Sequence, residues 1–481
     1  MNEYKLFVQR TVVVGITNLF IGLSGIILLP ILTKNLPVDE YGIWIQISVT
    51  VSLIPLIVTL GLPYTMVRFL PGLKNREEVQ EGFYSISFIV LFTSASTSLL
   101  LFLLSRPIAA RLFDDNATII KILSGVIFME CLNLLLLNFF RTFQQIKRYS
   151  IFSFIRASLK IVLVAFFILS GYRILGAVIG LLISSFFVFL IMASFIISEV
   201  GIKIPKFKNI KEYLSFGLPT IPGNLSSWIV NSSDRYIIGI FLGTAFVGYY
   251  SSGYILGNVI NMFIGPLAFM LPAVLSKYYD ENNMKEVKTI LRYSLKYFLL
   301  LAIPSAFGLS LLSKPLLTII STPEIASQGY LITPFVTVSA VLFGVYVVIA
   351  QGLYLAKRTD IGGKLWTIAA MLNLGLNFVF VPRMGIVGAA ITTLIAFTLV
   401  FIFAIYYSFR YLTFDVDFSS IGKSFLASIL MILVIIKWNS AEVLNILIEI
   451  GICGITYSVV LLLLRGFKRE EIAFLKGLFK T

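Results

Sequence analysis

The chain has 481 residues, of which 58% are hydrophobic and only 13% are charged, and its mean hydropathy is +0.96. A soluble globular protein carries about 25% charged residues, so this composition excludes a soluble protein and indicates a polytopic membrane protein. A net charge of +15 is compatible with nucleic-acid binding, but the lysines and arginines are distributed as in a membrane protein. The absence of histidine excludes histidine-based catalysis, histidine proton relays and most transition-metal sites.

Apolar runs of about 20 residues recur from end to end, and each is long enough to cross about 30 Å of hydrocarbon. In chain order, the predicted spans cover residues 11–32, 42–62, 83–104, 119–139, 151–171, 174–197, 213–242, 245–272, 292–313, 329–356, 364–381, 385–408, 421–438 and 441–464. Every connection between them is short. The predicted fold class is therefore all-α, with about 14 transmembrane helices and no soluble domain.

The lysines and arginines are divided unequally between the connections. With the odd connections on one side and the even connections plus both tails on the other, eight fall on the first side, twenty-six on the second and four within spans. Lysine and arginine concentrate in cytoplasmic loops. We therefore expect a multi-pass protein of the plasma (inner) membrane with both termini cytoplasmic. The basic excess is attributed to topology and to contact with anionic membrane lipids, not to nucleic acid.

Similar strings recur at a spacing near 210 residues. Arg148 precedes an apolar hairpin that contains Gly176, and Arg358 precedes one that contains Gly388, which gives offsets of 210 and 212 residues. Spans 1–6 thus resemble spans 7–12, and an even number of spans per half predicts parallel repeats. The predicted organisation is an N-terminal lobe at 1–200, a C-terminal lobe at 201–412, and two additional spans with a basic cytoplasmic tail at 413–481.

Four strings carry a resemblance to a known family: TKNLPVDEYG at 33–42, SDRYIIG at 233–239, VGYYS at 247–251 and PRMGIVGAA at 382–390. In their order, spacing and span number they resemble Wzx-type polysaccharide-biosynthesis flippases. These belong to the superfamily of multidrug, oligosaccharidyl-lipid and polysaccharide exporters. The resemblance covers the whole chain, and it implies a MATE-like arrangement of two six-helix lobes followed by two C-terminal helices.

The function implied by this resemblance is movement of a polyprenyl-pyrophosphate-linked oligosaccharide from the cytoplasmic to the outer leaflet by alternating access. No covalent step is needed, so neither enzyme activity nor a cofactor is expected. The expected partners are the lipid-linked oligosaccharide, membrane lipids and, further, a polysaccharide polymerase and glycosyltransferases. Two alternatives stay open: a cation-coupled multidrug exporter of the same superfamily, and a non-transporting membrane scaffold of envelope assembly.

Polar residues recur on one face of two successive spans. On span 7 they follow steps of 4, 3, 4 and 3, namely Thr220, Asn224, Ser227, Asn231 and Asp234. On span 8 they follow steps of 3, 4 and 3, namely Ser251, Tyr254, Asn258 and Asn261. Such steps place side chains on one helix face. Two polar faces predict a water-filled cavity between the lobes; the alternative is that these residues only join helices.

The helical spacing of the polar residues on spans 7 and 8 does not account for the charge of Arg235. An arginine inside a membrane costs at least a few kcal/mol unless it faces water or a partner. Asp234 lies about 100° away round the helix, so the two are not expected to face one another, and one of them is expected to pair with another helix. We expect Arg235 to supply positive charge to the translocation path; snorkelling to the interface is the alternative.

Span 5 carries a second pair of bases, because Arg156 and Lys160 are four residues apart and share a helix face. They are interpreted as a cationic wall that attracts a pyrophosphate, with interfacial snorkelling as the alternative. Arg68 and Arg292 are candidates for the same role, or ordinary anchors of the cytoplasmic side. Glu130 is the acid within span 4.

Two motifs are rejected. Ile421-Gly422-Lys423-Ser424 resembles the end of a phosphate-binding P-loop, but Asp417 replaces the first glycine and a transmembrane span follows. We therefore expect no built-in ATP hydrolysis. The acids of the first external loop, Asp39 and Glu40, would suit a membrane glycosyltransferase, but the large external domain typical of such enzymes is absent from the predicted topology.

Overall fold

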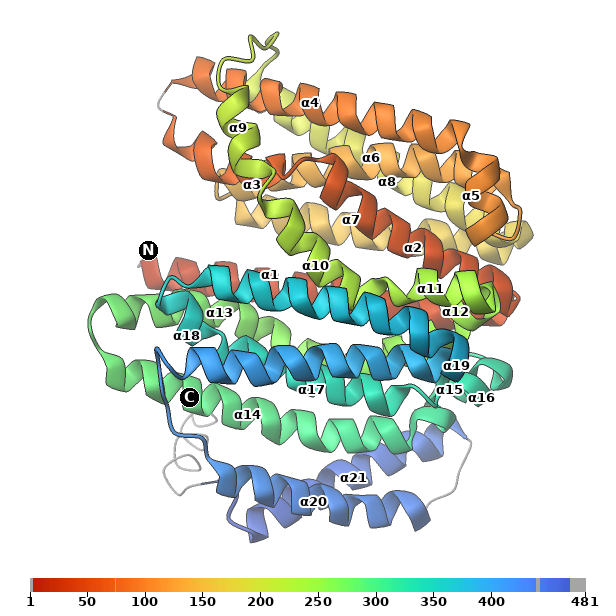
Figure 1. The fold of residues 1–481 in the computed structure, drawn as a ribbon, viewed down its shortest axis with the longest axis vertical. Coiled ribbons are helices and arrows are strands. Elements are labelled where there is room, and N and C mark those ends of the chain that lie inside the picture. Colours follow the sequence, from red (N-terminus) through yellow and green to blue (C-terminus); the bar gives the residue numbers. More distant parts are fainter. Residues whose placement is uncertain (1–2, 74, 438–441, 468–481) are drawn as a thin grey trace. The chain divides into compact units, whose positions relative to one another are not determined.

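The computed structural model describes residues 3–73, 75–437 and 442–467, and every regular element within these ranges is a helix (Figure 1). The chain divides into two compact units. Unit 1 comprises Met1–Ser251 and Trp366–Ala389, and unit 2 comprises Ser252–Leu365 and Ala390–Thr481. The lobes predicted from the repeat, with boundaries at 200 and 412, remain a prediction. Residues 468–481 of the basic tail lie outside the described residues.

Two helices contribute to both units, α12 (Thr244–Gly257) and α19 (Thr359–Ser408). The other elements of unit 1 are α1 (Glu3–Asn35), α2 (Val38–Val58), α3 (Leu62–Phe69), η1 (Leu70–Gly72), α4 (Arg76–Leu103), α5 (Ser105–Leu112), α6 (Ala117–Thr142), α7 (Ile146–Phe167), η2 (Ile168–Tyr172), α8 (Arg173–Val200), α9 (Ile210–Gly217), α10 (Thr220–Ser232) and α11 (Asp234–Leu242). The other elements of unit 2 are η3 (Asn258–Ile260), α13 (Asn261–Asp280), α14 (Met284–Leu311), α15 (Ser313–Ile320), α16 (Pro323–Gly329), α17 (Thr333–Ile349), α18 (Gln351–Leu355), α20 (Phe418–Lys437) and α21 (Val443–Leu463).

Helix α6 lies at the centre of unit 1, where it packs against α2, α3, α4 and α8. Of its most apolar stretch, 67% is buried inside the protein, against 17% for that of α4. Both sequences are strongly apolar, so composition alone does not separate a helix enclosed by protein from one that faces lipid. The difference comes from packing: α6 is surrounded by other helices, and α4 lies at the edge.

Two long helical segments are interrupted at a glycine. Between α7 and α8 the backbone leaves helical geometry at Gly171, with φ 87°, and within α19 it does so at Gly385, with φ 63°. A left-handed backbone is accessible to glycine at little cost, so each apolar run turns there. These are the hairpins expected from the sequence between spans 5 and 6 and between spans 11 and 12.

The structure confirms an all-helical polytopic membrane protein, and the count of fourteen spans stays a prediction. Within the described ranges, eleven helical segments are long and apolar enough to cross a membrane. Two of these eleven are the interrupted segments, 146–200 and 359–408, each long enough to cross twice. The expected span 213–242 is not among them, because it forms three short helices, α9, α10 and α11.

In unit 2, α14 packs against α13, α17 and α20, and α20 packs against α21. The start of α20 is fixed by Asp417, which accepts hydrogen bonds from the backbone N–H and hydroxyl of Ser420 and lies 3.4 Å from Lys296 Nζ on α14. The hydroxyls of Tyr457 and Ser424 lie 2.8 Å apart, and Lys423 donates to a backbone carbonyl. The string that resembles a P-loop therefore serves helix packing.

Candidate functional site

The segment that carries Asp234 and Arg235 is broken rather than continuous. Helix α9 ends at Gly217, α10 begins at Thr220 after Pro219, and Ser233 separates α10 from α11. Proline lacks a backbone N–H, which accounts for the first break. At the second, Tyr236 N–H donates to Ser233 O, a tighter turn than an α-helix has. The charged pair thus opens a new helix within the expected span 213–242.

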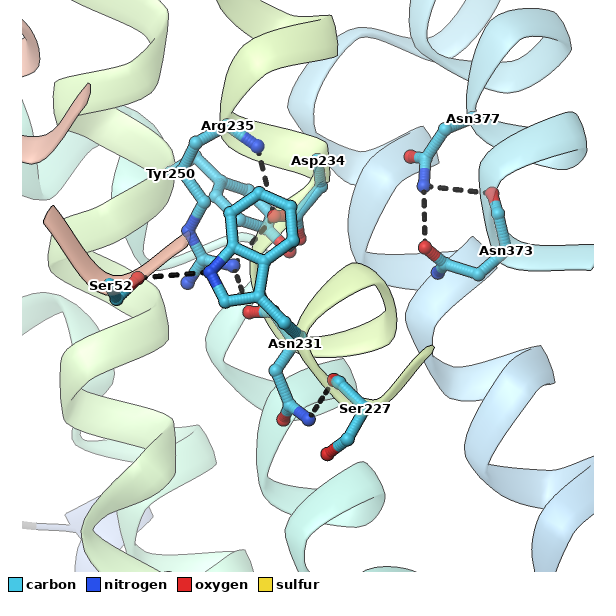
Figure 2. A network of polar contacts seen from close by, with 9 residues as sticks. Ser52, Ser227, Asn231, Asp234, Arg235, Tyr250, Asn373 and Asn377 are labelled. Atoms are coloured by element: carbon cyan, nitrogen blue, oxygen red, sulfur yellow. Dashed lines mark hydrogen bonds and ion pairs between the residues drawn. The ribbon is translucent and has the colours of Figure 1, made fainter. Parts of the chain in front are cut away.

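Asp234 and Arg235 form a closed ion pair (Figure 2). Arg235 Nη1 lies 2.6 Å from Asp234 Oδ1, and the Arg235 backbone N–H donates to the same oxygen over 2.9 Å. The side chain of Arg235 is 7% exposed and that of Asp234 is 1% exposed. The expectation that these neighbours do not face one another was wrong. The long arginine side chain folds back across the turn, which the 100° separation of the two Cβ directions does not prevent.

The expectation that one of the pair reaches another helix is confirmed by Tyr250 on α12. The Tyr250 hydroxyl donates to Asp234 Oδ2, and the Arg235 guanidinium lies 5.0 Å from the centroid of the Tyr250 ring. Arg235 Nη1 also donates to Asn231 O over 2.6 Å. One tyrosine therefore contacts both charges (Figure 2). Tyr250 lies in the string 247–251 that carried the family resemblance, but no sequence pattern paired it with Asp234.

Hydrogen bonds also attach this segment to α2. Trp228 Nε1 donates to Ser52 Oγ over 2.9 Å, and the hydroxyls of Tyr236 and Thr50 lie 2.6 Å apart. The side chains of Asp234, Trp228 and Tyr236 are thus hydrogen-bonded to neighbours on α2 and α12, as a low-dielectric setting requires. We use the name closed centre for the group formed by Asp234, Arg235, Tyr250 and the backbone carbonyl of Asn231.

The remaining polar residues of span 7 are less enclosed. Asn224 is half-buried, and the half-buried Asn231 donates to Ser227 O over 2.8 Å. Two amides that the sequence analysis did not single out are fully buried on α19: Asn377 Nδ2 donates to Asn373 O and lies 3.2 Å from its Oδ1 (Figure 2). Spacing of four residues on a helix was the available signal for this second pair.

The polar residues of span 8 beyond Ser251 belong to unit 2. Tyr254 is buried, whereas Asn258 and Asn261 are half-buried and joined by a hydrogen bond of 2.8 Å between their side chains. The helix tightens to a 3-10 turn at Asn258–Ile260, between α12 and α13. A cavity shared with the span 7 stripe stays a prediction.

A second charged group, which we call the open centre, consists of Glu130, Arg156, Lys160 and Ser185. Arg156 Nη2 donates to Glu130 Oε2, and Ser185 Oγ donates to Glu130 Oε1 over 2.6 Å. Lys160 Nζ lies 5.6 Å from the centroid of the Trp44 ring. Glu130 is 5% exposed, but the Arg156 side chain is 35% exposed. The sequence placed Arg156 and Lys160 on one face; it did not predict that Glu130 pairs with Arg156 or that Ser185 donates to Glu130.

The other basic candidates stand apart from these centres. Arg68 is exposed in the last turn of α3, and Arg292 is half-buried near the start of α14. Neither makes an ion pair with another of the described residues. Anchoring at the membrane boundary and contact with substrate therefore both stay predictions.

Comparison with known proteins gives a family and a fold. The sequence profile described as polysaccharide biosynthesis protein matches residues 31–324. A probable low-salt glycan biosynthesis flippase, Agl15 of Haloferax volcanii, is 24% identical over 254 residues, 53% of this chain and 54% of that protein. The probable flippase AglR of the same organism is 26% identical over 51% of this chain and 52% of its own length. The chain thus spans about half the length of these curated relatives.

Two solved structures share the fold. The inward closed conformation of the lipid II flippase MurJ superposes with a TM-score of 0.77 at 18% identity, over 94% of this chain and 98% of that one. An inward-facing multidrug resistance MATE family transporter of the MOP superfamily gives a TM-score of 0.65 at 16% identity, over 82% and 94% of the two chains. The expected MATE-like fold is therefore confirmed.

Proposed function

The chain belongs to the family of polysaccharide biosynthesis proteins, and on this premise we propose that it is a lipid-linked oligosaccharide flippase. It moves a polyprenyl-pyrophosphate-linked oligosaccharide from the cytoplasmic to the outer leaflet by alternating access of two lobes, 1–200 and 201–412. Family membership and the flippase names of the curated relatives support this proposal. Movement between leaflets forms and breaks no covalent bond, so the protein acts as a transporter and not as an enzyme.

The observation that carries the proposal is the open centre. It holds two bases, Arg156 and Lys160, against one acid, Glu130, so one positive charge is left over. The half-exposed guanidinium of Arg156 keeps donors available after its bond to Glu130. Arginine binds phosphate through two parallel N–H donors, and lysine adds a point charge. We assign the pyrophosphate of the substrate to this centre.

The sugar portion is assigned to the polar residues of spans 7 and 8. Amide and hydroxyl side chains match sugar hydroxyls because both donate and accept hydrogen bonds. The residues proposed to line this path are Asn224, Asn231, Asp234, Arg235, Tyr254, Asn258 and Asn261, with Arg68 at the cytoplasmic entrance. The isoprenoid tail stays in lipid, where its burial needs no protein cavity.

Within this path we give the closed centre a positioning role. Arg235 is 7% exposed in its side chain and is bonded to Asp234 and to the Asn231 carbonyl. Its charge is balanced where it stands, so a substrate phosphate would have to displace Asp234 to reach it. We infer that the pair holds the start of α11 against α12.

The protein is further proposed to lie in the plasma membrane with both termini cytoplasmic, and to work beside a polymerase and glycosyltransferases. A reporter fused after Thr481 and one inserted near Lys314 then report opposite sides of the membrane. The same side for both contradicts the topology and the parallel repeat.

The function is tested in liposomes that contain the purified protein and a labelled polyprenyl-pyrophosphate oligosaccharide. The expected result is that the label becomes accessible on the opposite leaflet at a rate that depends on the protein. A scaffold gives no movement. A drug exporter instead moves a cationic dye when a cation gradient is applied, and leaves the glycolipid where it was. Either result overturns the proposed function.

A further inference from the structure

A groove in unit 1, on the side that the proposed topology makes cytoplasmic, has a composition that the transport path does not explain. It lies between α4, α6 and α8 beneath the loop 201–209, and its volume is about 720 Å³. Phe88, Leu135 and Ala193 are typical of its lining, and Lys203 is the only charged residue in it. Its size falls within the range of pockets that bind small organic molecules.

A second cavity, of about 520 Å³, adjoins the groove at Lys203, which lines both. Its lining is polar and mixed in charge, and it contains Lys203, Lys206, Lys208, Glu77, Glu78 and Glu81. Some of these groups are held by the protein: Lys203 Nζ donates to Glu77 O over 2.9 Å, and Glu81 Oε1 accepts from the Lys206 backbone N–H over 2.7 Å. The cavity thus offers both ammonium and carboxylate groups, in equal number.

The loop above the groove is extended and alternates in exposure. Lys203, Pro205 and Phe207 are half-buried against the helices, and the Phe207 ring lies 5.3 Å from that of Phe88. Ile202 and Ile204 alternate with them and are 82% and 87% exposed, and Ile204 also contributes to the rim of the groove. Isoleucines so exposed beside lysines suit the boundary between acyl chains and headgroups, where apolar and cationic side chains insert together.

We propose that these two cavities form a binding site for one phospholipid of the cytoplasmic leaflet, and that its headgroup carries a phosphate and a primary amine. One acyl chain fills the apolar groove. The phosphate binds the lysines of the second cavity, and the ammonium group binds its glutamates. The lining holds three lysines and three glutamates, which match a zwitterionic headgroup better than an anionic one, because an anionic headgroup offers no cation to the carboxylates.

The test measures which lipid the full-length protein retains when it is taken from mixed vesicles and analysed by native mass spectrometry. The vesicles hold equal amounts of phosphatidylethanolamine, phosphatidylglycerol and phosphatidylcholine with identical acyl chains. Phosphatidylethanolamine is expected to be retained about fivefold more than either competitor. Equal retention of all three, or preference for phosphatidylglycerol, overturns the proposal.

Two pairs of variants locate the site. Ala193→Trp fills the groove and is expected to abolish the preference, whereas Ala95→Trp, at an exposed position of α4 outside the groove, leaves it unchanged. Combined Lys206→Gln and Lys208→Gln lower retention about fivefold, whereas Lys211→Gln outside the cavity does not. The lysine variants alter exposed side chains, so they decide the question even if Ala193→Trp fails to fold. Unchanged retention in them overturns the proposal.

Discussion

The closed and open centres of unit 1 use the same chemistry in opposite ways. In the closed centre the acid and the base are neighbours in sequence, both are enclosed, and Tyr250 contacts each of them. In the open centre Glu130 and Arg156 come from different helices, the arginine is 35% exposed, and Lys160 adds a second base. An enclosed, balanced pair fixes structure; a half-open pair with excess charge has capacity left for a ligand.

This difference predicts opposite consequences for substitution. Loss of one partner in the closed centre strands a charge in a low-dielectric environment, so stability falls. Loss of the base in the open centre removes the excess positive charge, so transport falls.

Asp234→Ala is expected to lower the free energy of unfolding by about 3–5 kcal/mol, because Arg235 is left buried without its counterion. The double variant Asp234→Leu with Arg235→Met should recover much of the loss, since neither charge remains. Denaturant unfolding in detergent, followed by tryptophan fluorescence, measures both. Glu199→Ala is the control: its pair with Arg148 is 42–46% exposed, so the cost is below about 1 kcal/mol. If Asp234→Ala costs no more than this control, the centre is not closed.

Arg156→Gln is expected to reduce glycolipid movement about tenfold to a hundredfold, the range for loss of a hydrogen bond to a charged group. Arg156→Lys should restore part of the rate, because charge survives without the two parallel donors. The liposome assay measures the rates. Arg148→Gln, an exposed position on the same helix α7, serves as the matched control. Equal rates for the two glutamine variants would show that the open centre does not bind the pyrophosphate.

Tyr250→Phe and Ser185→Ala each remove one hydroxyl that donates to a buried carboxylate. We expect Tyr250→Phe to cost about 2 kcal/mol of stability, since Asp234 is only 1% exposed and water cannot replace the donor. Ser185→Ala should cost about 1 kcal/mol, since the open centre keeps the flexible Arg156. Unfolding of both variants under one set of conditions compares them. A larger loss for Ser185→Ala would reverse the contrast between the centres.

Asp417 immediately precedes α20, outside the predicted spans, and forms a third charged pair with Lys296 on α14 in unit 2. Burial acts to raise the pKa of Asp417, but hydrogen bonds from Ser420 and the Lys296 charge outweigh it, so the pKa lies below its usual value. The stability contributed by the ionised carboxylate is therefore present above pH about 4 and is lost as the pH falls through the folded pKa.

The expected result is a small fall in unfolding temperature below pH about 4 that is absent from Asp417→Asn. Thermal melts of the two proteins at matched pH values measure it. Parallel curves for both proteins would show that this pair does not contribute.

The sequence by itself determined the fold class and much of the local geometry. Apolar runs long enough to cross a membrane leave few alternatives to helices, because backbone groups in lipid must bond within their own segment. The hairpin turns at Gly171 and Gly385 could also be located, since the repeated strings bracket them. The helical spacing of Arg156 and Lys160 correctly placed two bases on one face of α7.

Only the tertiary structure decided how the charges are paired. Spacing along one helix says where a side chain begins; it does not say how far a long side chain folds back, and for that reason the contact between Arg235 and Asp234 was missed. Tyr250 and Ser185 reach their carboxylates from other helices, at separations of 16 and 55 residues. Such contacts depend on helix packing, and packing energy is spread over many apolar side chains that have no distinctive local pattern.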